Sequence, residues 1–192
     1  DEDFRQKVRW LKMSMVPQAA MNSLNPVLKV GDQVAEPMMS HYDVKKSEAM
    51  RQVTRMFENV GVPLDFINRY AFERSGGMRQ LVAIAMSLVT TPDLIILDEP
   101  TSALDPLVAE EILKLLCRLQ AELGLSYVLI THDLDVVHRI AHRTAVMLKG
   151  SFVAFDRTDV IFEGPYHPYT CLLYTSAAAD DPPCVNPVAR RQ

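Results

Sequence analysis

The spacing of apolar residues changes along the chain, and each change marks a different kind of element. Between residues 25 and 90, apolar positions recur every three or four residues, which is the period of amphipathic helices. After residue 91, short runs that are almost entirely apolar alternate with a long helical pattern, as in proteins with a parallel sheet. The pattern therefore predicts an α/β fold in which a helical insert separates the first strand from the rest of the sheet.

The first part of the chain predicts one strand followed by helices. Trp10–Val16 is expected to form a short strand that delivers Gln18 at its end. Ser47 is expected to cap a helix that Gly61 ends, and a further helix is expected to begin at Ser75. The helix after Ser47 has apolar residues at helical spacing, namely Met50, Val53, Met56, Phe57 and Val60.

Two apolar strands and a long helix come next. Asp93–Leu97 is expected to be a strand covered on both faces, Pro106–Leu123 a helix, and Ser126–Thr131 a second strand. Because a strand–helix–strand unit of this length is almost always a right-handed crossover, both strands are expected to end at the same edge of the sheet. Open α/β sheets bind ligands at that edge. A short helix and two strands are expected afterwards, at Asp133–Ala141, Thr144–Leu148 and Ser151–Phe155.

Composition narrows the class of protein. The 192 residues carry a formal net charge of −4, which gives no basic surface for nucleic acid. The apolar runs are much shorter than the ~20 residues that span a bilayer. The cysteines (Cys117, Cys171, Cys184) lack metal-ligand spacing and suit a reducing cytosol. The ten methionines fall mostly on helical stripes, where they are expected to fill the core.

Two carboxylates, Asp98 and Glu99, follow the first apolar strand. Carboxylates at the end of a buried strand are costly unless a cation or strong donors meet them. In phosphoryl transfer one such group holds Mg²⁺ and its neighbour orients or deprotonates the attacking water. By themselves the two residues also fit an ordinary polar turn, but the attached segment Thr101–Asp105 argues against that alternative.

Ser75, Gly76 and Gly77 stand at the start of a predicted helix. A hydroxyl and exposed N–H groups converge there, and the helix dipole adds about half a positive charge, so the position can hold a phosphate. Glycine allows phosphate oxygens to approach the backbone closely. The triplet alone also fits an ordinary helix start.

These motifs occur in the order typical of the ATP-binding subunits of ABC transporters, and residues 8–170 resemble that family. Three segments resemble its dipeptide and oligopeptide importer branch, which also serves nickel: Met15–Val27, Gly76–Gln80 and Pro165–Thr170. Arg74 and Leu81 depart from the family pattern, which has an apolar residue and Arg at these positions.

The resemblance implies a role for each residue of the predicted site. Asp98 would be the Mg²⁺ partner, Glu99 the general base, and Gln18 a contact to the metal and the attacking water. His132 would bond the γ-phosphate of ATP, although a lone His after a strand can also be a plain polar terminus. His138 and His142, spaced four apart, are expected on a helix surface rather than on a metal.

The remaining residues are implied to work across a dimer. Ser75, Gly76 and Gly77 would contact the ATP held by the opposing subunit. Asp105 would contact that subunit as well, and a helix N-cap before Pro106 is a compatible alternative.

The implied fold is a partial P-loop NTPase (RecA-like) parallel sheet with an ABC-type α-helical subdomain. Residues 1–24 would end the first RecA-like half, and 25–90 would form the helical subdomain. Residues 91–155 would form the α/β core, and 156–192 a C-terminal extension. The sequence contains no Gly-x-x-x-x-Gly-Lys-Ser/Thr loop, so we expect a fragment that lacks the Walker A region, is inactive alone and exposes apolar surface.

The implied function is hydrolysis of ATP with Mg²⁺ to power an importer of peptides or related solutes. The implied partners are a second ABC ATPase subunit, identical or paralogous, the transmembrane permease subunits and, indirectly, an extracellular solute-binding protein. The protein would lie at the cytoplasmic face of the cell membrane and bind no nucleic acid. Two alternatives are a soluble ABC ATPase of DNA repair or translation, and a chain that is catalytically inert as it stands.

The end of the chain has two interpretations. Cys171–Ser176 can be encoded by TGT CTC TTA TAC ACA TCT, which resembles a transposon end used to prepare sequencing libraries. Residues 171–192 are then read-through of adapter DNA; the alternative is a genuine flexible tail.

The DNA that encodes residues 171–176 separates the two interpretations. Read-through predicts those six codons without change in the DNA from which this chain was translated, and inspection of that DNA checks this. Any other codon choice there contradicts the read-through hypothesis.

Overall fold

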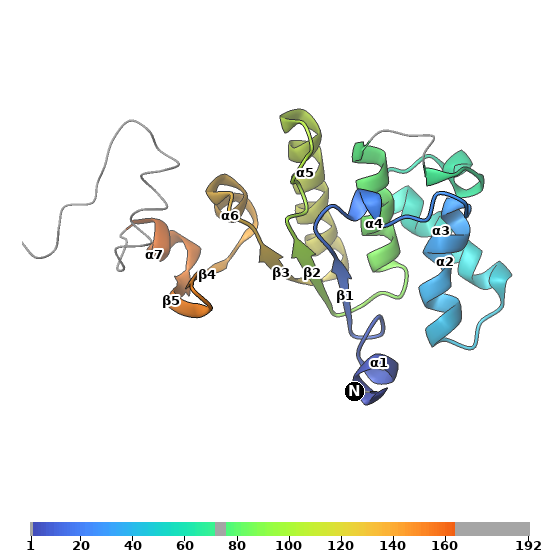
Figure 1. Cartoon of the computed structure of the whole chain (residues 1–192), viewed down its shortest axis with the longest axis horizontal. Coiled ribbons are helices and arrows are strands. Elements are labelled where there is room, and N and C mark those ends of the chain that lie inside the picture. Colours follow the sequence, from blue (N-terminus) through green and yellow to red (C-terminus); the bar gives the residue numbers. More distant parts are fainter. Residues whose placement is uncertain (1, 72–75, 164–192) are drawn as a thin grey trace, which may run out of the picture. The chain divides into compact units, whose positions relative to one another are not determined.

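The computed structural model describes residues 2–71 and 76–163, and the chain divides into two compact units between Ile130 and Thr131. The first unit contains a parallel sheet and a group of helices. The second contains a two-stranded hairpin and two short helices (Figure 1).

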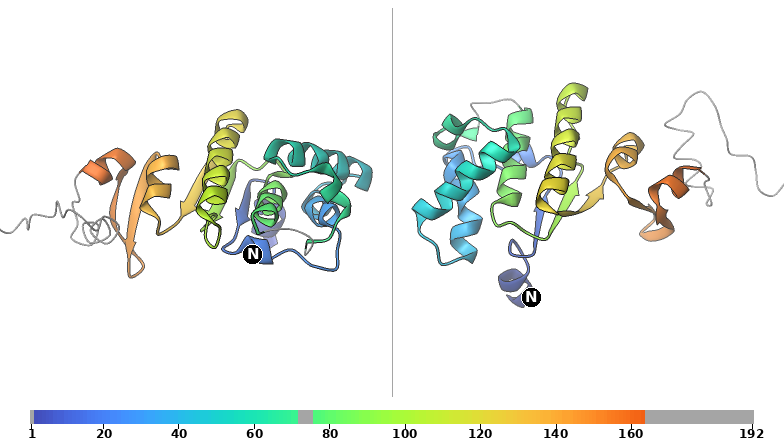
Figure 2. Two further views of the ribbon diagram at one scale, coloured as in Figure 1. Left: turned by 90° about the horizontal axis from the view of Figure 1, so that it is seen from above. Right: turned by 180° about the vertical axis from the view of Figure 1, so that it is seen from behind.

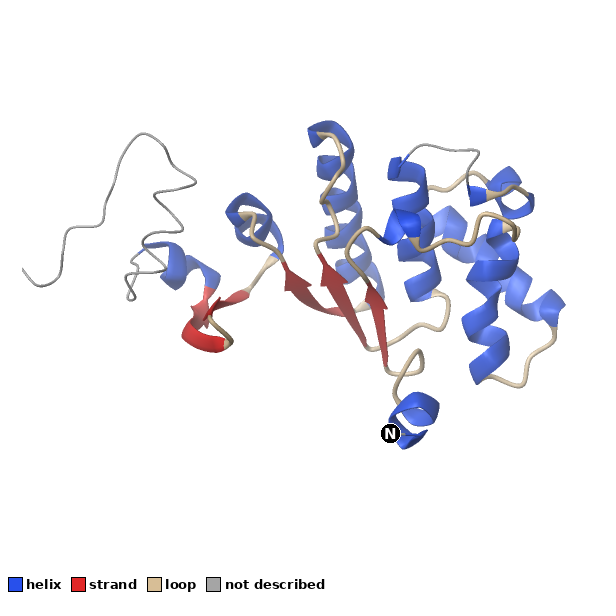
Figure 3. Cartoon of the chain, in the orientation of Figure 1, coloured by secondary structure: helices blue, strands red, loops and turns tan. Residues whose placement is uncertain are grey.

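The sheet of the first unit has three parallel strands in the order β1 (Met13–Val16), β2 (Leu94–Asp98) and β3 (Ser126–Ile130). Val16 lies opposite Leu97, and Asp98 lies opposite Ile130. The three arrowheads point the same way (Figure 3). The predicted parallel pairing of the two apolar strands is therefore confirmed, and all three strands end at one edge.

Two helices cover one face of this sheet, α4 (Gly76–Leu88) and α5 (Pro106–Leu123). Seen from behind, both lie in front of the strands (Figure 2, right). The covered face is buried: Val16 and Leu97 have no exposed surface. Burial of such side chains is the main favourable contribution to folding.

The opposite face of the sheet is partly exposed. Met15, Ile96 and Val128 are register partners across the three strands, and Met15 and Val128 are 44% and 45% exposed. Ile96 of β2 is itself half-buried, so the expectation that this strand is covered on both faces holds for only one face in the described residues. The prediction that the chain exposes apolar surface agrees with the exposure of Met15 and Val128 on this face.

The helical group consists of α2 (Val30–His41), α3 (Lys46–Val60) and two short 3-10 turns, Ala20–Asn22 and Leu64–Asn68, around α4. It has its own apolar core between the helices. Members with no exposed surface include Val34, Val53, Phe57 and Val82.

Ser47 does not cap α3, which corrects the prediction from sequence. The helix begins at Lys46, two residues before the predicted start, and its N-cap is Lys45, whose side chain makes no capping bond. Lys46, the first residue of α3, forms an exposed ion pair of 2.7 Å with Asp32 of α2. Gly61 ends α3 as predicted, with a φ of +79° that glycine adopts without strain.

The first strand is shorter than predicted. Trp10 has a φ of +66° and donates its N–H to the Met13 carbonyl over 2.8 Å, so the chain turns before β1 begins. A short helix, α1 (Glu2–Lys7), precedes this turn.

The second unit contains α6 (Leu134–Ile140), β4 (Arg143–Leu148), β5 (Ser151–Arg157) and α7 (Thr158–Glu163). The two strands are antiparallel and turn at Gly150, as predicted.

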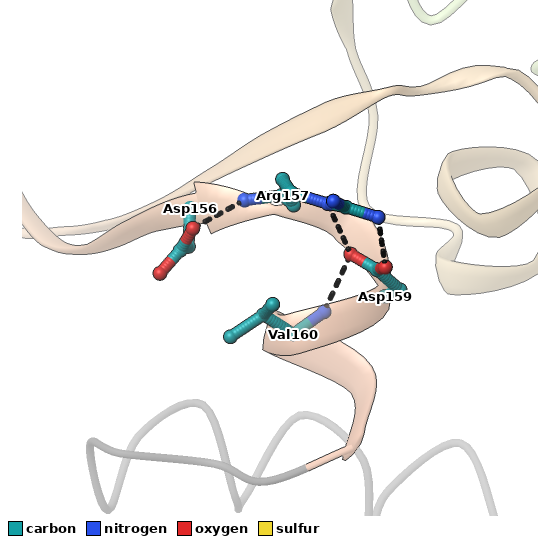
Figure 4. A network of polar contacts seen from close by, with 4 residues as sticks. All are labelled: Asp156, Arg157, Asp159 and Val160. Atoms are coloured by element: carbon teal, nitrogen blue, oxygen red, sulfur yellow. Dashed lines mark hydrogen bonds and ion pairs between the residues drawn. The ribbon is translucent and has the colours of Figure 1, made fainter.

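Asp159 joins the end of β5 to the start of α7. Its carboxylate accepts two hydrogen bonds from the Arg157 guanidinium and one from the Val160 backbone N–H (Figure 4). These bonds hold the pKa of Asp159 below its ordinary value.

Leu119 provides a test of the packing between α5 and the sheet. It is fully buried, whereas Leu123 on the same helix is 43% exposed. We expect Leu119→Ala to lower the free energy of unfolding by about 2–5 kcal/mol, because it leaves a cavity. Leu123→Ala, the matched control, should cost less than about 1 kcal/mol. Urea unfolding measures both, and equal losses would contradict the described packing.

Candidate functional site

Gln18, Asp98 and Glu99 lie at the same edge of the sheet. Gln18 comes two residues after Val16, and Glu99 comes two residues after Leu97, which is the register partner of Val16. Neighbouring strands are about 4.8 Å apart, so the two chain segments leave the sheet side by side. Gln18 is exposed, and Asp98 and Glu99 are half-buried. The structure thus brings these three predicted residues to one place.

Glu99 has a strained backbone. Its φ is +49°, a left-handed conformation that costs a residue with a side chain about 1–3 kcal/mol. Its N–H donates to the Ile130 carbonyl over 2.9 Å, and its carbonyl accepts from the Ser102 N–H at 3.1 Å and the Ser102 Oγ at 2.9 Å. These three bonds fix the turn that presents the Glu99 side chain. Sequence reasoning did not identify Ser102 as a support for this turn.

Gly77 lies where α4 approaches α5 closely. A Cβ at this position would come within 2.6 Å of the Val108 Cγ1 atom. Close packing of α4 against α5 therefore requires glycine at position 77, in addition to the predicted approach of a phosphate. Gly76 is the first residue of α4.

Asp105 is the N-cap of α5. Its carboxylate accepts a hydrogen bond of 3.1 Å from the Val108 N–H, and Pro106 follows as the first helical residue. The capping role proposed from sequence is confirmed. The contact of Asp105 with a partner subunit stays a prediction.

Gln80 is a site residue that sequence reasoning missed. It is 3% exposed, and its Nε2 donates a hydrogen bond of 2.8 Å to the backbone carbonyl of Pro100, the residue after Glu99. The available signal was a polar residue at a buried position of a largely apolar helix. Few such residues are buried without a specific partner.

Two predicted residues are not joined to this site by the described structure. Ser75 lies outside the described residues. His132 belongs to the second unit, so its approach to Glu99 stays a prediction.

His138 packs against Phe162, with ring centroids 5.0 Å apart. Within residues 2–71 and 76–163, no three or more His, Cys, Asp or Glu side chains are grouped so that they could enclose a metal ion. In the same part of the chain, no helix has the length and apolar character needed to cross a membrane.

Residues 2–102 match the family model described as ABC transporter. The chain belongs to the ABC transporter family. Its relatives in that family include the oligopeptide transport ATP-binding protein OppD of Bacillus subtilis (strain 168), which is 43% identical over 89% of this chain. The dipeptide transport ATP-binding protein DppD of Lactococcus lactis subsp. cremoris is 40% identical over 94% of this chain.

The chain spans about half the length of these relatives, 48% of OppD and 52% of DppD. Among solved structures, the chain resembles the ATP-binding cassette MJ0796 in a dimeric post-hydrolysis state bound to ADP and Pi. The TM-score is 0.71 at 30% identity, with 82% of this chain and 68% of MJ0796 covered. The α/β fold with a parallel sheet is therefore that of an ABC cassette.

The capping role of Asp105 in this ABC chain can be separated from its proposed role at a partner. Asp105→Ala removes the acceptor for the Val108 N–H and should lower the free energy of unfolding by about 1 kcal/mol. Asp105→Asn keeps an acceptor and should stay within ~0.5 kcal/mol of the parent chain. Denaturant unfolding measures both, and equal losses in the two variants would contradict the capping bond.

Proposed function

We propose that this chain is the ATP-binding and ATP-hydrolysing part of a subunit that powers an importer of peptides or of related solutes. The observation that carries the proposal is the convergence of Gln18, Asp98 and Glu99 at one sheet edge of an ABC cassette. OppD and DppD, which are named as oligopeptide and dipeptide transport ATP-binding proteins, support the class of solute.

Asp98 and Gln18 suit a magnesium ion bound together with nucleotide. Mg²⁺ prefers oxygen ligands and usually takes one or two carboxylates from the protein, with phosphate and water completing its shell. Asp98 supplies a half-buried carboxylate and Gln18 an exposed amide oxygen from the neighbouring strand. The bound ion would neutralise charge that develops on the phosphates.

Glu99 would act as the general base. Its carboxylate would orient the attacking water and accept the proton that water loses as it attacks the γ-phosphate. A base must be held in place for this reaction, and the three hydrogen bonds around the Glu99 backbone do so. His132 would hold the γ-phosphate in register with Glu99.

A second ABC subunit, identical or paralogous, would complete each site. Gly76 and Gly77 at the start of α4, and Ser75 before them in the sequence, would donate N–H and O–H groups to the ATP of that subunit. Asp105 would contact it beside them. The dimeric state of MJ0796 supports this arrangement.

The helical group would contact the transmembrane permease subunits at the cytoplasmic face of the membrane. Val27 and Leu28 are exposed apolar residues, at 76% and 49%, on the loop between Gln18 and α2. Gln33 fixes this loop: it accepts a bond from the Asn25 N–H and donates to the carbonyls of Asn25 and Leu28. An ordered loop with an exposed apolar tip suits a protein partner.

The test uses a hybrid protein, because no Gly-x-x-x-x-Gly-Lys-Ser/Thr loop occurs in the 192 residues. The hybrid places before residue 1 a strand–loop–helix segment of an ABC ATPase that contains this loop. We expect Mg²⁺-dependent ATPase activity that Glu99→Gln lowers at least about a hundredfold while ATP still binds, because the base is lost. Steady-state turnover and nucleotide titration measure these quantities.

Glu111→Gln is the matched control, since Glu111 is an exposed glutamate on α5. It should leave turnover unchanged. Near-normal turnover of the Glu99→Gln hybrid would contradict the assigned base, and turnover by residues 1–192 alone would contradict the need for a phosphate loop.

A further inference from the structure

We propose that Gln80 is a positioning residue that ties the start of α4 to the turn carrying Glu99, and thereby couples the two ATP sites of the dimer. The inference rests on the proposed function, because in the proposed dimer the start of α4 and Glu99 act on two different ATP molecules. The start of α4 would contact the ATP of the opposing subunit, and Glu99 would act on the ATP of its own.

The link is a single buried hydrogen bond between distant parts of the sequence. The Nε2 atom of Gln80 donates to the Pro100 carbonyl over 2.8 Å, and Gln80 is 3% exposed. Water does not readily replace a bond in such a place, so a shift of either partner leaves a polar group buried and unpaired. The bond therefore favours a common movement of α4 and the turn.

Pro100 is the residue whose position bears most directly on Glu99. Glu99 has a left-handed φ of +49°, and its own carbonyl is held by the N–H and Oγ of Ser102. The next carbonyl along the chain, that of Pro100, is held by Gln80. Both carbonyls that follow the strained residue are thus fixed, one from within the turn and one from α4.

A second contact joins α4 to the helix that follows this turn. Gly77 lies against the Val108 side chain so closely that a Cβ on Gly77 would be 2.6 Å from Val108 Cγ1. Val108 lies in the first turn of α5, which begins directly after the loop that Glu99 opens. Gly77 and Gln80 are three residues apart and so lie on one side of α4. The N-terminal part of α4 is therefore in contact with this region at two points, with Pro100 through Gln80 and with the first turn of α5 through Gly77.

Coupling follows from this arrangement. When the opposing ATP draws the start of α4 toward it, the buried bond passes the displacement to Pro100 and alters the strained backbone of Glu99. Binding at one site then changes the position of the base at the other. A buried, hydrogen-bonded contact whose position both sites influence can carry energy between them.

Hydrogen exchange on residues 1–192 tests the link itself. The probe is the Ser102 N–H, which donates to the Glu99 carbonyl over 3.1 Å. Gln80→Met keeps the size of the side chain and removes the donor, and we expect Ser102 exchange about tenfold faster. Ser87→Ala is the control, because Ser87 is a buried residue of α4 whose hydroxyl donates to the Ile84 carbonyl of the same helix. Equal exchange in the two variants overturns the proposal.

Gln80→Glu gives the Ser102 exchange rate a dependence on pH that a mere loss of packing would not produce. A protonated carboxyl can donate to the Pro100 carbonyl, whereas a carboxylate cannot, and burial raises the pKa of such a group. Relative to Ser87→Ala at the same pH, protection of the Ser102 N–H should return as the pH falls through that pKa. This variant also tests the proposal if circular dichroism shows Gln80→Met to be unfolded. A ratio of Ser102 exchange rates between Gln80→Glu and Ser87→Ala that does not change with pH overturns the proposal.

The hybrid ATPase tests the coupling. Gln80→Met should lower turnover several-fold and bring the Hill coefficient for ATP toward 1, with little change in the half-saturating ATP concentration. An unchanged Hill coefficient overturns the coupling between sites. A parent hybrid that hydrolyses no ATP refutes the proposed function instead, and the exchange results then still decide whether Gln80 holds the turn.

Discussion

Parallel pairing of β1, β2 and β3 is the constraint on which the candidate site depends. Because the strands run the same way, the residues that follow each of them emerge at one edge. Gln18 and Glu99 are 81 positions apart in the chain, yet the pairing of Val16 with Leu97 places them side by side. A one-residue slip in this register would reverse which side chains face α4 and α5.

The Glu99 turn shows how the fold supports a strained residue beside its site. Its left-handed backbone is fixed by Ile130 of the adjacent strand, by Ser102 in the same turn and, through Pro100, by Gln80 of α4. Three different elements therefore determine one backbone conformation. Strain that the surrounding structure fixes in this way is typical of functional sites.

The sequence predicted what depends on local periodicity and missed what depends on tertiary contacts. Pro106–Leu123 was predicted to the residue, because its apolar stripe, its Asp105 cap and its C-terminal glycine agree. Ser47 failed as a cap because α3 already begins at Lys46, which pairs with Asp32 of another helix, a contact that no local pattern reveals. The bond from Gln80 to Pro100 was equally out of reach, since it joins residues of two different elements. The ABC family was predicted from motif order, and the comparisons confirm it.

The most direct test of the central claim is to locate the metal–nucleotide complex relative to the sheet edge. In the hybrid protein with ATP and Mn²⁺ in place of Mg²⁺, nuclear magnetic resonance measures which amide signals the paramagnetic ion broadens. The account predicts strong broadening for Gln18, Asp98 and Glu99 and little for Ser126, at the opposite end of β3. Broadening centred elsewhere, with the signals of Asp98 and Glu99 unaffected, would contradict it.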